Sequence, residues 1–354
     1  MHSVDGVADE VIHRSSTQRV LFIVFIVLLS IVPLSASRFY MGLLATIYLS
    51  ILGSLGLCLL TGVAGQVSIG NAAFMAVASF TVASGSVQFG LPLFVTIPIG
   101  ACVAAASGVL VGVAAVRMRG LYLVIATLAF HYVVIYAAKR YQLAASGAAG
   151  FVLPEASVGG IVLRDTLWYL LLLLVAVLAI KVVTNLIQSR FGRAWSAIRQ
   201  REAIAEVVGV HVGGYKLLVF GTSAFLIGIQ GGLLAYYVGF VSVDGFTLDV
   251  AIQYLAMVIV GGQGSVLGAV LGAVFVTLLP YVVRNLVDHV PASLPGVYQL
   301  TAHTFQIQAA LYGLGIIVVL LFEPSGLAGL YRRGWGYVRT WPISEIGVAT
   351  GEYS

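Results

Sequence analysis

Two short stretches of the chain share a pattern of uncharged hydrogen-bonding residues. Residues 65–68 (GQVS) and 262–265 (GQGS) both follow the pattern G-Q-x-S, and each precedes a run of small and apolar residues that predicts a helix. The start of a helix presents free N–H groups and the positive end of the helix dipole, which favour a bound carboxylate. The pattern therefore marks five candidates for a substrate pathway: Gln66, Ser68, Asn71, Gln263 and Ser265.

The same pattern has a simpler interpretation. A four-residue match with one free position can arise by chance in a chain that contains 41 glycines. Glycine and serine at the start of a helix are also good caps, whatever the helix does. Both interpretations stay open at the level of the sequence.

A second group of chemically active side chains lies near the middle of the chain. No Asp, Glu, Lys, Arg or His occurs from Phe39 to Val116 or from Leu217 to Val243. Residues 190–216, in contrast, hold four arginines, one lysine, two glutamates and one histidine. Good helix formers between Gly192 and Gly209 predict a single amphipathic helix over 192–209.

Two roles fit the charges of this expected helix. Glu202 and Glu206 lie one turn apart and repel each other slightly, so that this face gains from a basic protein partner. The arginines would alternatively let the helix lie on anionic lipid. The charge pattern alone favours neither role.

Several catalytic signatures are absent from the sequence. None of the three lysines follows a glycine, so the nucleotide-binding pattern G-x-x-x-x-G-K-[ST] does not occur, and neither H-E-x-x-H nor G-x-S-x-G is present. Cys58 and Cys102 lie in apolar runs and are expected to be small core residues rather than metal ligands. We therefore expect no enzyme activity, no cofactor, no metal and no nucleic-acid partner.

The composition determines which environment can hold these residues in place. The chain is 60% hydrophobic and only 9% charged, whereas soluble domains carry about 25% charged residues. A spanning helix needs roughly 20 apolar residues, and runs of this length recur along the whole chain. The expected fold is all-α, a polytopic transmembrane helical bundle with about 8–10 membrane segments and membrane lipid around it.

One apolar stretch does not fit a simple crossing. The residues from Val250 to Val283 contain no charge and are interrupted by GGQGS at 261–265, which predicts a short arm, a break and a return helix. The expected helices lie near 20–37, 40–61, 66–88, 92–115, 121–138, 166–185, 215–239, 251–262, 265–283 and 307–322.

The distribution of arginines predicts the orientation of the bundle. Cytoplasmic loops are enriched in Lys and Arg. The fold-back near 261–265 places the basic segments 14–19, 117–119, 190–201 and 332–339 on one side, which would be the cytoplasm. We therefore expect a cytoplasmic N-terminal tail (1–19), a transmembrane domain (20–330) and a cytoplasmic C-terminal tail (331–354).

Four blocks of sequence, in this order, carry a resemblance to a known family. They are GQVSIGNAAFMAVASFTVA (65–83), GRAWSAIRQREAIAEVVGVHVGGYKLLVF (192–220), VGGQGSVLGAVLGA (260–273) and FEPSGLAGL (322–330). From about residue 40 to 330 the chain resembles the membrane permease subunits, of the M type, of branched-chain amino-acid ABC transporters. It departs from the family at Gly70-Asn71, where relatives often have Gly-His, and in having Gly209 seven residues after Glu202 rather than six.

The resemblance implies a function and a set of partners. The chain would be a permease of an ATP-driven importer in a prokaryotic cell (inner) membrane. It would work with a homologous second permease, two ATP-binding subunits, and a periplasmic or lipid-anchored substrate-binding protein. Residues 192–209 would be the coupling helix that docks on an ATPase subunit, with the contacts made by Arg193, Trp195, Arg199, Glu202, Glu206 and Gly209.

Three other functions remain open at this stage. A urea or short-amide importer would use the same fold, with a different pore lining. An ion-coupled secondary amino-acid transporter would need an intramembrane carboxylate, which the expected spans lack, or a cage of backbone oxygens. A polytopic membrane enzyme is disfavoured because the catalytic signatures are absent.

Overall fold

The fold is described from a computed structural model of the chain. The described residues are 29–34, 37–118, 120–158, 161–288 and 326–331, with isolated positions at 310, 313, 314, 317 and 321. The tails expected at 1–19 and 331–354 lie outside them, apart from Tyr331. So do most of the helices expected at 20–37 and 307–322.

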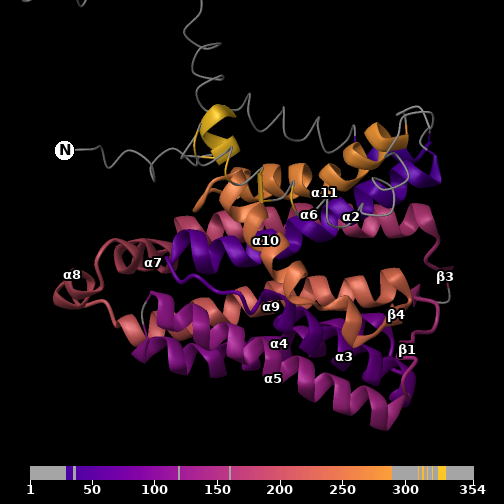
Figure 1. Ribbon diagram of the computed structural model, residues 1–354, viewed down its shortest axis with the longest axis horizontal. Helices are drawn as coiled ribbons and strands as arrows, with labels where there is room; N and C mark the ends of the chain where they lie inside the picture. The colour runs from indigo at the N-terminus through magenta and orange to yellow at the C-terminus, as the bar shows by residue number, and fades with distance from the viewer. Residues whose placement is uncertain are drawn as a thin grey trace, which may run out of the picture.

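Helices run the length of the molecule from end to end (Figure 1). Within the described residues, seven helical segments are long and apolar enough to cross a membrane. This confirms the predicted all-α polytopic bundle. In chain order the helices are η2 (Val32–Leu34), α2 (Arg38–Leu57), the π-helical turn η3 (Cys58–Val63), α3 (Asn71–Phe89), α4 (Leu93–Arg117), α5 (Leu121–Ala145), α6 (Asp165–Gln188), α7 (Arg190–Gln200), α8 (Glu202–Val207), α9 (Val212–Val238), η4 (Val243–Gly245), α10 (Leu248–Gly261) and α11 (Val266–Asp288).

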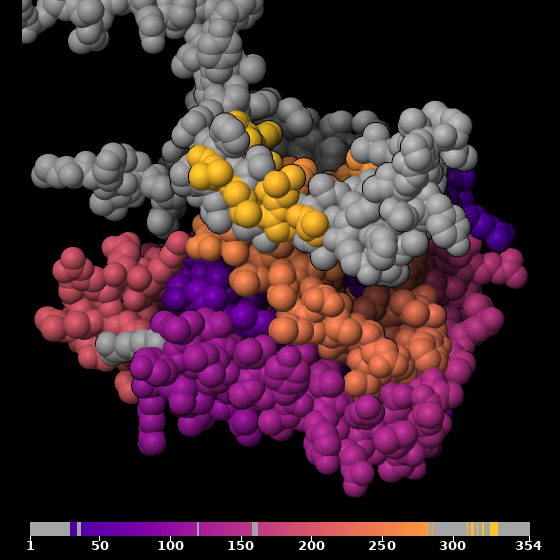
Figure 2. Space-filling model, viewed as in Figure 1, coloured from indigo at the N-terminus to yellow at the C-terminus, as the bar shows by residue number. Residues whose placement is uncertain are grey.

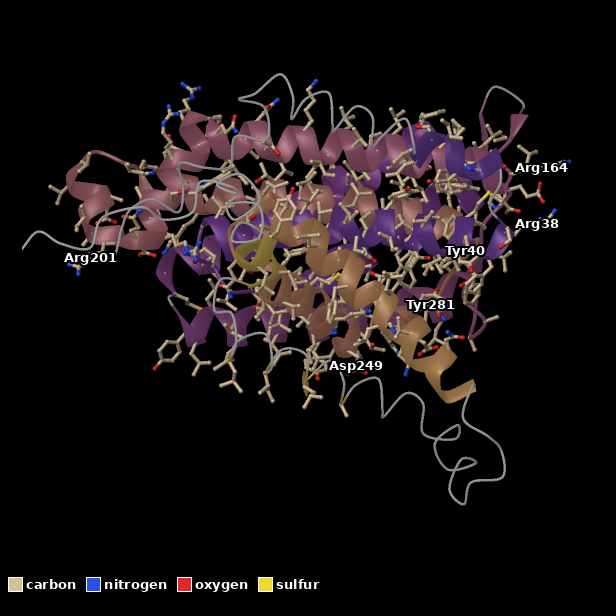
Figure 3. All side chains as sticks on the ribbon, turned by 90° about the horizontal axis from the view of Figure 1, so that it is seen from above. Arg38, Tyr40, Arg164, Arg201, Asp249 and Tyr281 are labelled. Atoms are coloured by element: carbon tan, nitrogen blue, oxygen red, sulfur yellow. The ribbon has the colours of Figure 1, made fainter. Side chains whose placement is uncertain are left out.

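The two ends of the bundle differ. Two small antiparallel strand pairs lie at one end: β1 (Phe151–Val152) with β4 (Phe240–Val241), and β2 (Ser157–Val158) with β3 (Ile161–Val162). The short helices α7 and α8 project at the other end (Figure 1). Figure 3 shows Arg38 and Arg164 at the strand end and Arg201 at the α7–α8 end.

Small residues bring α4 and α9 into direct backbone contact. A Cβ atom added at Gly108 would lie 2.5 Å from the Cβ of Ala224 and 2.7 Å from the carbonyl oxygen of Phe220. A Cβ added at Gly228 would lie 2.8 Å from the Cα of Ala101. In lipid, where hydrophobic burial does not drive helices together, such close packing is a main source of association.

The predicted fold-back is confirmed. α10 ends at Gly261, α11 begins at Val266, and the two helices pack closely enough that a Cβ at Gly272 would lie 1.8 Å from the carbonyl oxygen of Met257. With 14 residues α10 alone is about 21 Å long, and it reaches the length of a candidate span only together with η4, over Val243–Gly261. Gly326 contacts Gly262, so residues 326–331 begin beside the break between α10 and α11, whereas the basic segment 332–339 lies outside the described residues.

Three predicted boundaries are wrong. The helix expected over 66–88 begins only at Asn71, because the chain turns at Gly65 (φ +69°) and stays non-helical before α3. The helix expected over 121–138 continues to Ala145. The single helix expected over 192–209 is two helices, because Arg201 between α7 and α8 adopts an extended conformation (φ −157°, ψ 112°).

The glycine contacts predict a difference between two alanine substitutions. Gly108→Ala inserts a methyl group where none fits, and overpacking of this kind costs about 1–3 kcal/mol. At Gly213 in α9, a Cβ would meet only Val116, at an ordinary 3.5 Å, so Gly213→Ala should be neutral or slightly stabilising. Thermal unfolding of the purified chain in detergent should show a lower midpoint for Gly108→Ala alone. Equal midpoints would contradict this account of the α4–α9 contact.

Candidate coupling site and substrate pathway

Residues 190–209, here called the coupling segment, are attached to the bundle by local caps and one buried ring. The side chain of Ser189 accepts a hydrogen bond from the backbone N–H of Phe191 and so caps α7. Trp195 is buried, and its Nε1 donates to the carbonyl oxygen of Tyr215 at 2.9 Å. This bond and the packing around the indole fix α7 against the start of α9.

The coupling segment ends in a glycine-dependent turn. The N–H of Gly209 bonds to the carbonyl of Glu206 at 3.0 Å, and the N–H of Val210 bonds to the carbonyl of Ala205 at 2.9 Å. This pair of bonds is a Schellman motif, which requires a residue with positive φ at its turn. Gly209, with φ +90°, supplies it.

The two glutamates of the coupling segment have different surroundings. Glu202 forms an ion pair with Lys216, with 2.6 Å between Oε1 and Nζ. Lys216 is almost fully buried, and its Nζ also lies 3.5 Å from the carbonyl oxygen of Ala115 in α4. Glu206 is exposed. The two carboxylates therefore do not form one free acidic face, because Glu202 ties α8 to α9 and α4.

The two arginines predicted as ATPase contacts also point to different places. Arg193 is exposed, and its Nη1 donates to the carbonyl of Gln188 at 3.1 Å, near the end of α6. Arg199 donates from Nη1 to the carbonyl of Gly62 in η3. The predicted contact residues are thus spread over the segment: Glu206 and Arg193 are exposed, whereas Trp195 and Glu202 hold it to the bundle.

The second G-Q-x-S stretch contacts η3, the turn that precedes the first stretch. A Cβ at Gly62 would be 2.5 Å from the backbone nitrogen of Gly264, and the Sγ of Cys58 donates to the carbonyl of Ser265 at 3.6 Å. Both stretches lie at the α7–α8 end, close to Arg199. The structure thus brings together two segments that are about 200 residues apart, which the repeated pattern alone did not establish.

The five predicted pathway residues differ in what their side chains do. Ser265 caps α11 by accepting from the N–H of Gly268 at 3.1 Å, and Ser68 accepts from the N–H of Gly70 at 3.2 Å. Gln66 is buried, with its Nε2 3.5 Å from the carbonyl of Ala64, whereas Gln263 is exposed. Ser265 therefore acts as a helix cap, and Ser68 makes a local bond in the turn before α3.

Asn71 keeps hydrogen-bonding capacity that the described residues do not use. It is 1% exposed at the start of α3, and neither Oδ1 nor Nδ2 has a partner among the described residues. A buried amide without partners is costly, typically by about 1–3 kcal/mol. Of the buried candidates, Asn71 is the one whose side chain has no partner among the described residues and is therefore available to a ligand or to water.

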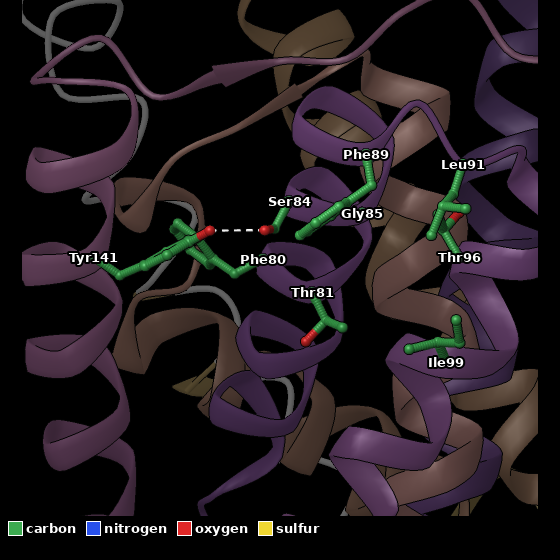
Figure 4. A pocket seen from close by; sticks show the side chains of 9 residues that line it. All are labelled: Phe80, Thr81, Ser84, Gly85, Phe89, Leu91, Thr96, Ile99 and Tyr141. Atoms are coloured by element: carbon green, nitrogen blue, oxygen red, sulfur yellow. Dashed lines mark hydrogen bonds between the residues drawn. The ribbon is translucent and has the colours of Figure 1, made fainter.

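A cavity that the sequence analysis did not predict lies near the strand end of the bundle, among α3, α4 and α5 (Figure 4). Its volume is about 410 Å³. At its wall the hydroxyls of Ser84 and Tyr141 lie 2.7 Å apart, and the Nε2 of Gln88 donates to Tyr141 at 3.1 Å. Thr81, Ser84 and Gln88 follow helical spacing along α3, which is a signal that the sequence did contain. The lining residues are Phe80, Thr81, Ser84, Gly85, Phe89, Leu91, Thr96, Ile99 and Tyr141.

The outward face of α5 carries tyrosines. Tyr122, Tyr132 and Tyr136 recur at helical spacing and are all exposed, and a second hollow of about 580 Å³ adjoins Tyr122 and Arg117. α5 lies along one outer edge of the bundle (Figures 1 and 2). The exposed large side chains of α4 before Arg117 are purely hydrocarbon in contrast: Phe94, Val95, Ile99, Val103, Val109, Leu110, Val113 and Val116.

Comparison with known proteins gives matches over most of the chain. The model of the family described as "Branched-chain amino acid transport system / permease component" matches residues 39–320. The high-affinity branched-chain amino acid transport system permease protein LivM of Escherichia coli (strain K12) is 29% identical over 347 residues, 91% of this chain and 77% of that protein. The protein of the same name from Salmonella typhimurium (strain LT2) is 28% identical with the same coverage. No solved structure matches.

The ion pair between Glu202 and Lys216 predicts different effects for the two glutamates. Glu202→Ala leaves a buried ammonium without its partner, which costs about 3–5 kcal/mol. Glu206→Ala removes an exposed carboxylate and should change stability by less than about 0.5 kcal/mol. The two variants should therefore differ clearly in their thermal unfolding midpoints in detergent.

A second substitution separates the loss of the ion pair from a general packing defect. The double variant Glu202→Ala with Lys216→Met removes both charges and should recover most of the lost stability. Equal destabilisation by Glu202→Ala and Glu206→Ala, or no recovery in the double variant, would contradict the role given to this pair.

Proposed function

The chain belongs to the family of permease components of branched-chain amino acid transport systems, and on that premise we propose that it is the membrane-spanning subunit of an ATP-driven (ABC) importer. Its substrates would be branched-chain or related small amino acids, carried across the membrane of a prokaryotic cell. The observation that carries the proposal is the family match over residues 39–320. The same residues fold largely as apolar helices that are long enough to cross a membrane.

The sequence and the exposed residues of the coupling segment support separate ATP-binding subunits. The chain lacks the glycine-lysine signature of a nucleotide site, so hydrolysis requires another protein. α8 projects from the bundle (Figure 1) and exposes Ile204, Val207 and Val208. Apolar residues exposed together on a short helix favour a protein contact there. We assign this contact to one of two ATPase subunits. The α7–α8 end would then face the cytoplasm, and both termini would lie on the same side.

A homologous second permease is supported by the tyrosine face of α5. Tyr132 and Tyr136 lie near the middle of a 25-residue helix, at a depth where lipid tails would surround an unpaired subunit. Transfer of a hydroxyl to a medium without hydrogen-bond partners costs roughly 4–8 kcal/mol. We therefore propose that the second permease packs against this face of α5. Water or polar groups at the interface between the two subunits would then bond to the tyrosine hydroxyls. Substrate would be delivered by a periplasmic or lipid-anchored binding protein.

Two rival functions remain. A urea or short-amide importer would share the fold and the partners. An ion-coupled secondary amino-acid transporter would act alone, and the interior of the described spans holds no carboxylate that could bind its coupling ion: Asp165 and Asp249 lie in the first turns of α6 and α10. The absence of such a group favours the ATP-driven mechanism.

Reconstitution tests the proposed function. In proteoliposomes the chain alone should neither hydrolyse ATP nor accumulate amino acids. Addition of its ATPase subunits, second permease and binding protein should give ATP-dependent uptake of leucine, isoleucine or valine. Uphill uptake by the chain alone under a proton or sodium gradient would refute the proposal, and uptake of urea in preference to leucine would favour the amide importer.

Spin-label accessibility tests the position of the second permease. In a variant with Cys102 replaced by alanine, a label at Tyr136→Cys should be accessible to oxygen when the chain is alone in lipid. Oxygen accessibility should fall several-fold when the second permease is added. A label at Leu174→Cys, on the exposed hydrocarbon face of α6, should not change. A fall in oxygen accessibility at Leu174 instead of Tyr136 would show that the partner packs against α6, and it would contradict the position proposed here.

A further inference from the structure

Arg199 reaches from the coupling segment into the place where two interrupted helices meet. Its Nη1 donates to the carbonyl oxygen of Gly62 in η3. A Cβ at Gly264, in the break between α10 and α11, would lie 2.8 Å from the same Nη1. A Cβ at Gly65, just after η3, would lie 2.8 Å from the Cγ of Arg199. The arginine, which as a whole stays exposed, thus lays its side chain along a slot that is open on one side and that exists because both positions are glycine.

The chemistry of the slot suits a cation. η3 is the end of a helix whose last carbonyls lack partners within the helix itself, so a positive charge is favoured there. The carbonyls of Leu59 and Leu60 accept from the N–H groups of Ala64 and Gln66, and the carbonyl of Gly62 accepts from the guanidinium. A hydrogen bond from a charged donor is stronger than one between neutral groups.

The slot also lies where three separate parts of the chain meet. Gly62 and Gly264 are in backbone contact, and Gly326 contacts Gly262 beside them. The end of α2, the α10–α11 hairpin and the residues at 326–331 therefore converge where Arg199 enters. On the other side, Arg199 is carried by α7, whose Trp195 donates a hydrogen bond to the carbonyl of Tyr215 in α9.

We propose that Arg199 is a positioning residue that latches the coupling segment to these two helix breaks, rather than a contact to an ATPase subunit. Displacement of α7 would withdraw or press the guanidinium against Gly62 and Gly264, and so change the packing of α2 against the α10–α11 hairpin at this end of the bundle. The role in transport rests on the proposed function, whereas the latch itself is a property of the isolated chain.

Cys58 is a native reporter for the latch. It is fully buried in η3, beside Gly62, and its Sγ contacts Ser265 on the other break. Cys102, the other cysteine of the chain, is exposed and can be replaced by alanine. In this single-cysteine chain in nanodiscs, modification of Cys58 by a small maleimide measures how often the junction opens.

Arg199→Gln should raise the rate of Cys58 modification about tenfold, and Arg199→Lys, which keeps one charged donor, should give a smaller rise. Arg201→Gln is the matched control, since it makes the same charge change two residues away on a side chain that points away from the bundle (Figure 3). An unchanged rate in Arg199→Gln, or an equal rise in Arg201→Gln, would overturn the latch. So would a lower unfolding midpoint in Arg199→Gln large enough to account for the faster labelling.

In the assembled transporter, the latch predicts uncoupling rather than disassembly. Arg199→Gln should co-purify with the ATPase subunits and hydrolyse ATP, while the ATP consumed per amino acid imported rises about tenfold, with partial rescue in Arg199→Lys. Loss of co-purification would show a docking contact instead, and an unchanged ratio would show no role in transport. Failure of the proposed function is distinct, because the unsubstituted complex would then show no ATP-dependent uptake.

Discussion

The direct backbone contact between α4 and α9 is the packing feature on which the bundle depends. In a bilayer the lipid tails compete with apolar side chains for the same surfaces, so shape and backbone approach have to supply the association energy. Glycines on both helices allow that approach. Two buried serines also bond α9 to neighbouring helices. Ser79 of α3 donates to the carbonyl of Gly231 in α9 at 2.8 Å, and Ser223 of α9 donates to the carbonyl of Gly56 in α2 at 2.7 Å.

Close packing of this kind makes charge expensive, and the chain places it accordingly. Lys216 lies near the start of α9, just before its long apolar run, and is nearly fully buried. A buried ammonium needs an ionic partner, and Glu202 supplies it. The consequence reaches the coupling segment, because the carboxylate that pairs with Lys216 belongs to α8. The segment that projects furthest from the bundle is therefore held by an ion pair at α8, an indole at α7 and a guanidinium at the helix breaks.

The sequence predicted the features that depend on composition and missed those that depend on tertiary contacts. The fold-back was visible because a charge-free stretch too short for two crossings contains GGQGS. The break at Arg201 could not be predicted, because arginine is a good helix former. The ion pair that holds α8 in place involves Lys216, which lies outside the coupling segment. Ser68 and Ser265 were ambiguous for a different reason. The oxygen atom that caps a helix is the one that would bind a ligand, and only its observed partner separates the two roles.

The polar groups of the bundle suggest why an uncharged route suits a zwitterion. α3 begins at buried Asn71 near the helix breaks and carries Thr81, Ser84 and Gln88 toward the cavity at the strand end, while the neighbouring α5 adds Tyr141. A fixed charge in such a place would attract one end of an amino acid and hold it. Hydroxyls and amides can instead replace water around both the ammonium and the carboxylate of the amino acid. The free energy of the substrate would then stay similar from one position to the next along such a path. Arg199, one of several arginines near the α7–α8 end, directs a guanidinium nitrogen to the carbonyl of Gly62, and the proposed latch uses that contact rather than a contact with the substrate.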